Sequence, residues 1–178
     1  MTSKKRILSG LQPSGKLHIG NYFGSIKPNV DLFMENEGLF MVADYHALTS
    51  LKNPAELRAN IIENAKDYLA AGLNLENAAL FKQSDVPEHT EMAWIFDCLV
   101  TVKFLELGHA YKDKVARGLE ANAGLLTYPM LQAADILLYD TDVVPVGEDQ
   151  RQHVEYAHEA TAKFNKAYGE TFKEPAEL

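Results

Sequence analysis

The sequence predicts an α/β fold: a Rossmann-like parallel sheet flanked by helices. Short apolar runs of strand length alternate with longer segments of helical period along the chain. Neighbouring parallel strands need a helix-sized crossover between them, and this alternation supplies it. A glycine-rich turn at residues 9–24 follows the first apolar run, at the end of a strand where such sheets bind ligands. A chain of 178 residues, 47% of them hydrophobic, suffices for one domain, which we assign to residues 1–178.

Four apolar runs are the expected strands, at residues 5–9, 38–44, 78–84 and 142–147. The helices are expected at residues 20–35, 53–72, 91–107, 127–140 and 148–169. The second helix has the clearest ends, because Asn53 suits the N-cap, Pro54 the first turn and Gly72 the C-terminal end. Pro28 should kink or split the first helix.

The third expected helix, residues 91–107, is the most apolar of the five. We interpret its Trp94, Cys98 and Leu105 as core residues rather than as ligands. The neighbouring basic cluster of Lys112, Lys114 and Arg117 is interpreted as a solvated loop.

Composition narrows the class of protein. The net charge of −8 argues against nucleic acid as the dominant partner of this chain. The apolar runs are far shorter than a bilayer span, and no apolar segment of a signal peptide follows the N-terminal charges. A single cysteine excludes an internal disulfide and a cysteine-built metal site. We therefore expect a cytoplasmic protein without a membrane partner.

The stretch "SGLQPSGKLHIGNYFG" carries the strongest functional signal. Its glycines let backbone amides approach a ligand, and the start of a helix favours an anion. His18 and Asn21 are one helical turn apart, so both side chains can face one bound group. The stretch contains neither the dinucleotide fingerprint nor a P-loop lysine. Either it is a surface loop that binds nothing, or a polyanion binds there.

Four motifs resemble those of the class I aminoacyl-tRNA synthetases. "HIGN" at 18–21, after "GLQPSG", looks like the first nucleotide-binding motif of that class. "DYHA" at 44–47, "LLTYPMLQAADILLY" at 125–139 and "VPVGEDQRQHVE" at 144–155 resemble the tryptophanyl-tRNA synthetase branch, in order. The tyrosyl branch usually closes the first motif with a second histidine, so Asn21 favours tryptophan.

The resemblance implies a reaction. Tryptophan and ATP would form tryptophanyl-adenylate with release of pyrophosphate, and the tryptophanyl group would pass to tRNA(Trp) in the full-length protein. The tryptophan carboxylate would attack the α-phosphate of ATP directly, so catalysis would depend on positioning and charge stabilisation. Mg²⁺ would be bound through the ATP phosphates, with no protein-built metal site. The family also implies a homodimer, with the apolar stretch around Trp94 contributing to its interface.

The resemblance also assigns residues, with His18 and Asn21 as the catalytic ones. The residues expected along ATP are Gln12, Pro13, Ser14, Gly20, Asn21, Gly147, Glu148 and Asp149. The residues expected around tryptophan are Asp135, Tyr128, Gln150 and His46. The indole offers one N–H donor and no acceptor, so a buried carboxylate suits it.

Simpler interpretations stand beside these roles. Asp135 could be an exposed helix residue, and His46 a hydrogen-bonded loop histidine. Glu148 and Asp149 could complement a helix dipole. The four remaining histidines are interpreted as structural or surface residues: His89, His109, His153 and His158.

Family members are roughly twice as long as this chain. They continue with a second nucleotide motif of the lysine-methionine-serine-lysine-serine type and a helical anticodon-binding domain, which residues 1–178 do not contain. We therefore expect a truncated catalytic domain. Two other hypotheses remain: a non-catalytic tryptophan- or adenylate-binding module or paralogue, and a different nucleotidyltransferase, which gives no reason for "YPMLQAAD".

Overall fold

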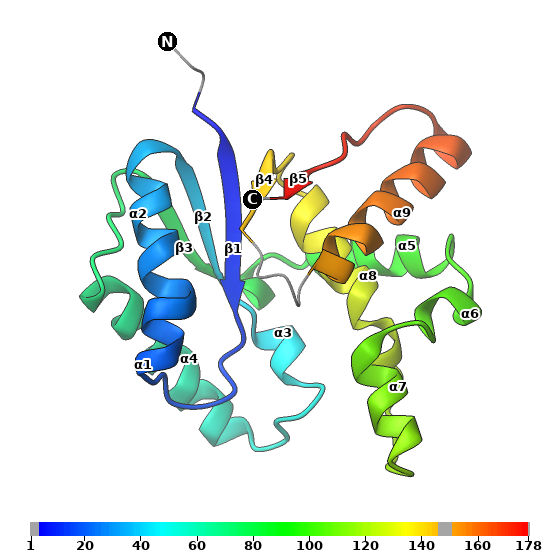
Figure 1. Cartoon of the computed structure of the whole chain (residues 1–178), viewed down its shortest axis with the longest axis horizontal. Coiled ribbons are helices and arrows are strands. Elements are labelled where there is room, and N and C mark those ends of the chain that lie inside the picture. Colours follow the sequence, from blue (N-terminus) through cyan, green and yellow to red (C-terminus); the bar gives the residue numbers. More distant parts are fainter. Residues whose placement is uncertain (1–3, 146–150, 178) are drawn as a thin grey trace. The chain divides into compact units, whose positions relative to one another are not determined.

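The computed structural model describes residues 4–145 and 151–177. The chain forms two compact units, Met1–Val86 and Pro87–Leu178, and each is described by itself. Their elements are labelled in Figure 1. Among the described residues, no helix is both long enough and apolar enough to cross a membrane.

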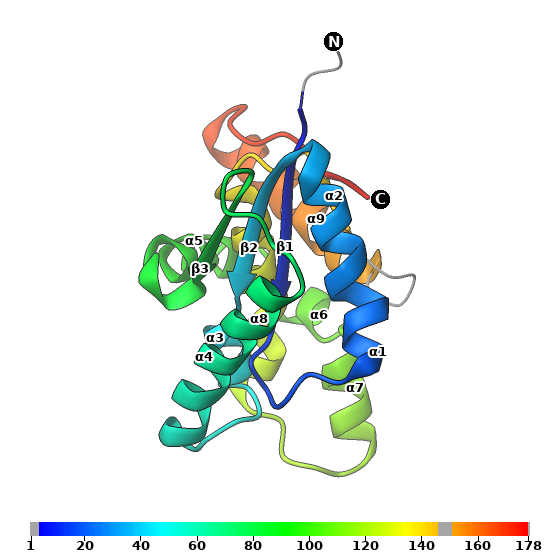
Figure 2. The same ribbon diagram turned by 90° about the vertical axis from the view of Figure 1, so that its left-hand side faces the viewer.

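The first unit contains three parallel strands with β2 in the middle. They are β1 (Arg6–Leu11), β2 (Glu37–Val42) and β3 (Ala78–Lys82). The three run side by side in Figure 2. Ile7, Phe40 and Met41 are at most 3% exposed and form the centre of this unit's core. Strand β3 falls within its predicted run, and β1 and β2 extend theirs by two residues and one residue, which confirms the parallel arrangement for this part of the chain.

The helix after β1 is divided, as Pro28 predicts. It consists of α1 (Ile19–Asn21), a π-helical turn η1 (Tyr22–Ile26) and α2 (Lys27–Glu35). In a regular α-helix the Pro28 ring would clash with the carbonyl group of Gly24. The wide turn ends just before Pro28, and such turns often occur at functional sites.

The other helices of this unit follow β2 and β3. They are α3 (Asp44–Ala47), α4 (Pro54–Ala70) and the 3₁₀ turn η2 (Gln83–Asp85). The Asn53 side chain accepts hydrogen bonds from two backbone N–H groups of the first turn of α4. Gly72 ends the helix with a φ of +100°, where glycine is favoured. Both predicted ends of this helix are confirmed.

The carboxyl ends of the three strands lie in register. Leu11 pairs with Val42, and Val42 pairs with Lys82. The segments that begin at Gly10, Asp44 and Ser84 therefore start from one edge of the sheet, as expected. The fourth expected segment begins at Gly147, outside the described residues.

The second unit is mainly helical. Its helices are α5 (Glu88–Asp97), α6 (Val102–Leu105), α7 (His109–Ala116), α8 (Ala123–Leu137) and α9 (Arg151–Tyr168). Two short parallel strands accompany them, β4 (Val143–Val144) and β5 (Ala176–Glu177). Helix α8 contacts α5 and α9, and its second half is buried. The unit therefore builds its core around α8.

Three expectations for the second unit were wrong. The helix predicted over 91–107 is two helices, because the chain turns after Asp97 and the Thr101 side chain accepts from the Phe104 N–H to begin α6. Trp94 is 70% exposed and Cys98 is also exposed, although Leu105 is buried. The predicted basic loop forms α7 with its C-cap Arg117, and β5 was not predicted.

Candidate nucleotide and amino-acid sites

The His-Ile-Gly-Asn turn is held by two reciprocal hydrogen bonds. The Gly20 N–H donates to His18 Nδ1 at 3.1 Å, and the His18 N–H donates to Asn21 Oδ1 at 3.0 Å. A Cβ atom at Gly20 would lie 3.0 Å from two atoms of the His18 ring, so glycine at this position leaves room for the ring. The turn is thus a cap in which three of the four residues have defined structural roles.

This cap determines which atoms face outward for chemistry. It uses the Nδ1 acceptor of His18 and the Oδ1 acceptor of Asn21. The neutral His18 ring must then carry its proton on Nε2, and Asn21 has its amide N–H groups to offer. The expected anion site differs in one respect: the Gly20 N–H already donates to His18 and is not offered to a ligand. The groups suited to a phosphate oxygen are the two side-chain donors.

The preceding "GLQPSG" loop is tied to α4. Asn60 on α4 donates from Nδ2 to the Pro13 carbonyl oxygen at 3.2 Å, and Pro13 is buried. The neighbouring Gln12 and Ser14 are exposed, and the Ser14 N–H donates to the Gln12 carbonyl oxygen at 2.8 Å. Asn60 was not predicted to hold this loop, because it is 47 residues from its partner.

A second connection joins β1 to the divided helix. Asn29 donates to the Ser9 hydroxyl oxygen at 2.7 Å and to the Ser25 hydroxyl oxygen at 3.3 Å. Asn29 and Ser9 are 5% and 8% exposed. Buried hydrogen bonds of this kind fix the helix against the strand, because breaking one leaves an unsatisfied polar group.

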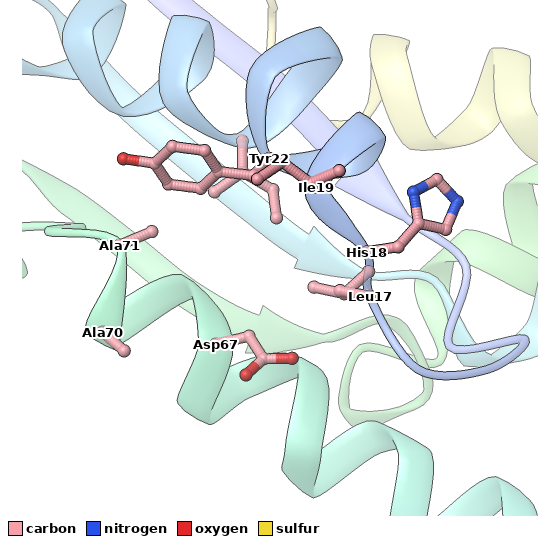
Figure 3. Close-up of a pocket in the computed structure, with 8 residues that line it drawn as sticks. Leu17, His18, Ile19, Tyr22, Asp67, Ala70 and Ala71 are labelled. Atoms are coloured by element: carbon pink, nitrogen blue, oxygen red, sulfur yellow. The ribbon is translucent and has the colours of Figure 1, made fainter.

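A pocket of about 370 Å³ adjoins the same turn. In Figure 3, Leu17 and Tyr22 lie over the end of α4 that carries Asp67 and Ala70, and the His18 ring points away from that segment. The lining is mostly apolar and contains a carboxylate, which repels phosphate. The pocket is therefore a poor site for a triphosphate, and the outward donors of His18 and Asn21 are the better candidates.

The "DYHA" segment is anchored to η2. The Asp44 carboxylate accepts from the Ser84 N–H at 2.9 Å and from the Ser84 hydroxyl at 2.6 Å. The Tyr45 N–H donates to Oε1 of the buried Gln83 at 3.1 Å. His46 lies on the one-turn helix α3 and is 5% exposed. It is a buried helical residue at the carboxyl edge of the sheet rather than a loop histidine.

The candidate tryptophan residues of the second unit lie on α8. Asp135 is 2% exposed, so the interpretation of it as a surface residue was wrong. Tyr128 is two helical turns earlier on the same helix and is half-buried. Burial raises the pKa of Tyr128, so its phenol keeps its proton at neutral pH.

His89 is the residue that sequence reasoning missed at this site. It is completely buried, with Nδ1 at 2.6 Å from Asp135 Oδ1 and Nε2 at 2.8 Å from the Tyr139 hydroxyl oxygen. No local pattern indicates this contact, because His89 and Tyr139 are 50 residues apart. The interpretation of His89 as a structural or surface residue placed it outside the site that contains Asp135.

The remaining predicted residues, Gly147, Glu148, Asp149 and Gln150, lie outside the described residues. Within residues 4–145 and 151–177, no three His, Cys, Asp or Glu side chains are placed to hold a metal ion together.

Comparison with known proteins gives the class first. A family model described as "tRNA synthetases class I (W and Y)" matches residues 1–178, and the chain belongs to this family. The Tryptophan--tRNA ligase of Fusobacterium nucleatum is 54% identical over 175 residues, which make up 98% of this chain and 54% of that protein. The chain thus spans about half the length of this relative.

Solved structures agree with this assignment. The tryptophanyl-tRNA synthetase of Campylobacter jejuni matches with a TM-score of 0.94 and 46% identity, over 99% of this chain and 55% of that one. A second structure of the Campylobacter jejuni enzyme, complexed with ADP and tryptophan, has a TM-score of 0.91 and 47% identity, over 97% of this chain and 54% of that one. These matches confirm the Rossmann-like α/β class and the resemblance to the tryptophanyl branch.

Proposed function

We propose that this protein activates tryptophan with ATP to form tryptophanyl-adenylate and, at the full length of its relatives, transfers the tryptophanyl group to tRNA(Trp). The observation that carries the proposal is the 54% identity to a Tryptophan--tRNA ligase over 98% of the chain. The solved relative that binds ADP and tryptophan supports a nucleotide and an amino-acid site within this half.

For the phosphates, the support comes from the capped turn. With His18 Nδ1 accepting from Gly20, the ring presents an Nε2–H donor at a fixed orientation. Asn21 adds amide donors from the same turn. As the tryptophan carboxylate attacks the α-phosphorus, negative charge grows on the phosphate oxygens, and preoriented donors stabilise it. Gln12, Pro13, Ser14 and Gly20 would lie along the nucleotide. The Asn60 contact holds the loop at Pro13.

We propose that Mg²⁺ is bound by the phosphates of the nucleotide rather than by protein side chains. It would neutralise charge on the phosphate oxygens when bound. A phosphate-held Mg²⁺ needs few protein ligands. Of the residues proposed for the ribose and base, Gly147, Glu148 and Asp149, none is described structurally.

For tryptophan, the support comes from the buried carboxylate of Asp135. An indole N–H is a donor without an acceptor, and an ionised carboxylate is an acceptor only, so the two match. A site that makes such a bond rejects analogues that leave the carboxylate unpaired. Tyr128, with Gln150, would face the substrate ammonium through its phenol oxygen, and His46 would lie near the same ligand.

We also propose a homodimer. Support comes from the exposed apolar side chains of residues 94–102, here called the Trp94 surface: Trp94, Ile95, Cys98 and Val102. Trp94 and Val102 are 70% and 61% exposed, and aromatic residues of this kind are enriched where proteins associate. A Trp94→Ser variant should then sediment as a monomer at concentrations where the parent is a dimer; equal sedimentation would reject this surface as the interface.

The proposed activity is tested by isotope exchange between pyrophosphate and ATP with the 178-residue chain. Exchange should require tryptophan, and tyrosine should not replace it. Exchange that is equally fast with tyrosine would contradict the proposal. Saturable tryptophan binding without any exchange, both in this chain and at the full length of its relatives, would favour the non-catalytic binding module.

A further inference from the structure

Asp135, His89 and Tyr139 form a buried chain of hydrogen-bonding groups that joins α5 to the end of α8. His89 lies in the first turn of α5, Asp135 lies near the end of α8, and Tyr139 follows that helix. The His89 ring lies between the carboxylate at 2.6 Å and the phenol at 2.8 Å. The exposed fractions of His89 and Asp135 are 0% and 2%.

For these three side chains, one proton arrangement is consistent with a neutral His89 and an ionised Asp135. An ionised carboxylate can only accept, so His89 must carry its proton on Nδ1 and donate it to Asp135. The bare Nε2 atom then accepts the phenol proton of Tyr139. Burial, with smaller contributions from Asp135 and Glu88, raises the pKa of Tyr139 to about 12, so the phenol has a proton to donate.

This arrangement affects how well Asp135 can accept a hydrogen bond from a ligand N–H group. A buried carboxyl group without a partner tends to take up a proton, and it then becomes a donor itself. A protonated Asp135 would be a weaker acceptor for an indole N–H than the ionised carboxylate. Nδ1 of His89 lies 2.6 Å from the Asp135 carboxylate, a contact that favours the ionised form and limits its rotamer. A carboxylate has about four acceptor sites, so a second donor can bind as well.

We propose that His89 is a positioning residue of the amino-acid site: it holds Asp135 ionised and in one orientation so that the carboxylate can accept a ligand N–H, with Tyr139 selecting the required histidine tautomer. This inference rests on the proposed role of Asp135 in binding tryptophan. It assigns a specificity function to a buried histidine that makes no contact with the substrate itself.

Two histidine variants separate this role from simple filling of the core. In His89→Asn the amide nitrogen is as many bonds from Cα as Nδ1 of histidine, so the donor to Asp135 is retained. In His89→Gln the amide nitrogen corresponds to Nε2, so that donor is displaced. Both variants keep a neutral amide in the core. They differ mainly in the position of the amide nitrogen, which corresponds to the atom facing Asp135 in His89→Asn and to the atom facing Tyr139 in His89→Gln.

The experiment measures binding of two probes to the 178-residue chain by equilibrium dialysis. The probes are L-tryptophan and 3-benzothienylalanine, in which sulfur replaces the indole N–H. His89→Gln should weaken tryptophan binding by about 10- to 100-fold, the scale of one hydrogen bond to a charged group, and should leave the sulfur analogue less affected. His89→Asn should restore most of the preference for tryptophan. An unchanged preference in His89→Gln would overturn the proposal.

A spectroscopic readout keeps the proposal testable if a variant does not fold. Nitrogen-15 NMR of the unsubstituted protein should show His89 protonated at Nδ1, and Tyr139→Phe should weaken that tautomer preference. An Nε2–H tautomer in the unsubstituted protein would overturn the proposal. Asp135→Ala distinguishes the two levels, because alanine has no acceptor for the ligand N–H. If it keeps the preference for tryptophan, the proposed role of Asp135 fails. Loss of the preference in Asp135→Ala together with a normal His89→Gln variant rejects the role of His89 alone.

Discussion

The two candidate sites are built in different ways. The His18 turn is made by bonds between residues two and three positions apart, and its residues are largely exposed. The Asp135 site depends on a buried histidine from another helix, with a partner 50 residues away. The first is a local device whose residue types specify its shape. The second exists only once α5 and α8 have packed together, so its chemistry depends on the core of the second unit.

His18 offers the largest expected effect and separates chemistry from structure at the local site. His18→Ala should slow adenylate formation by about 10²–10³-fold, because it removes a donor to the developing phosphate charge. His18→Asn is the matched control, since asparagine is a good N-cap that can accept from the Gly20 N–H but has no equivalent of the Nε2–H donor. Both variants should be slow in rapid-quench assays. Recovery in His18→Asn would show that the cap, rather than the donor, matters.

Gly38 tests how closely the first unit is packed. A Cβ atom there would lie 2.5 Å from Cγ of Phe33, which is itself buried. Gly38→Ala should therefore lower the free energy of unfolding by about 1–3 kcal/mol, the usual cost of overpacking a core. Gly24→Ala is the matched control, because nothing lies within 4 Å of its Cβ position. Urea denaturation monitored by circular dichroism measures both, and equal stability of the two variants would contradict this packing.

Asp97 tests the second unit through pH. Burial raises the pKa of Asp97 to about 6, and its Oδ1 atom has no hydrogen-bond partner among the described residues. A folded-state pKa above the unfolded value means that the folded state holds the extra proton, so stability falls as pH rises from about 4 to 6. Asp97→Asn should raise Tm relative to the parent above pH 6 and should match it near pH 4.

The control for this pH effect is the exposed Glu106→Gln. Its Tm should follow that of the parent at both ends of the range when measured by calorimetry. A gain for Asp97→Asn that is the same at every pH would mean that burial of the charge is not its cause.

Asn60 has the smallest expected effect and tests the tether of the nucleotide loop. Asn60→Ala removes the bond to the Pro13 carbonyl oxygen and should cost about 1 kcal/mol, the net value of a typical hydrogen bond. The loss should appear as a weaker apparent affinity for ATP in exchange assays, with the tryptophan affinity retained. Weakening of both substrates alike would point to a general loss of folding.

Apolar runs and helix-cap residues predicted those parts of the fold that depend on neighbouring residues in the sequence. The strands of the first unit, the Asn53 cap and the Gly72 end follow from apolar runs and cap residues that act within a few positions. The long helix over 91–107 was wrong because composition alone does not show where α5 stops. On α5 the polar His89 is buried and Trp94 is exposed, the reverse of the hydrophobicity rule.

The candidate sites follow the same division. Two sequence motifs indicated His18, Asn21 and Asp135 as candidate residues, whereas the contacts of Asn60 and His89 required the tertiary structure. Their partners are reached only through packing of helices distant in sequence, and asparagine and histidine carry no pattern that reveals such a partner. The sequence also did not predict which atoms of the His18 turn remain available as donors, because residue types alone do not show which atoms the cap uses.

The central claim is that this half of the molecule contains a tryptophan site read by Asp135. Equilibrium dialysis of labelled tryptophan against the 178-residue chain tests it most directly, with tyrosine as competitor and Asp135→Ala as the comparison. We predict saturable binding that excess tyrosine does not displace and that Asp135→Ala loses. Displacement by tyrosine, or full binding by the folded Asp135→Ala variant, would contradict the account.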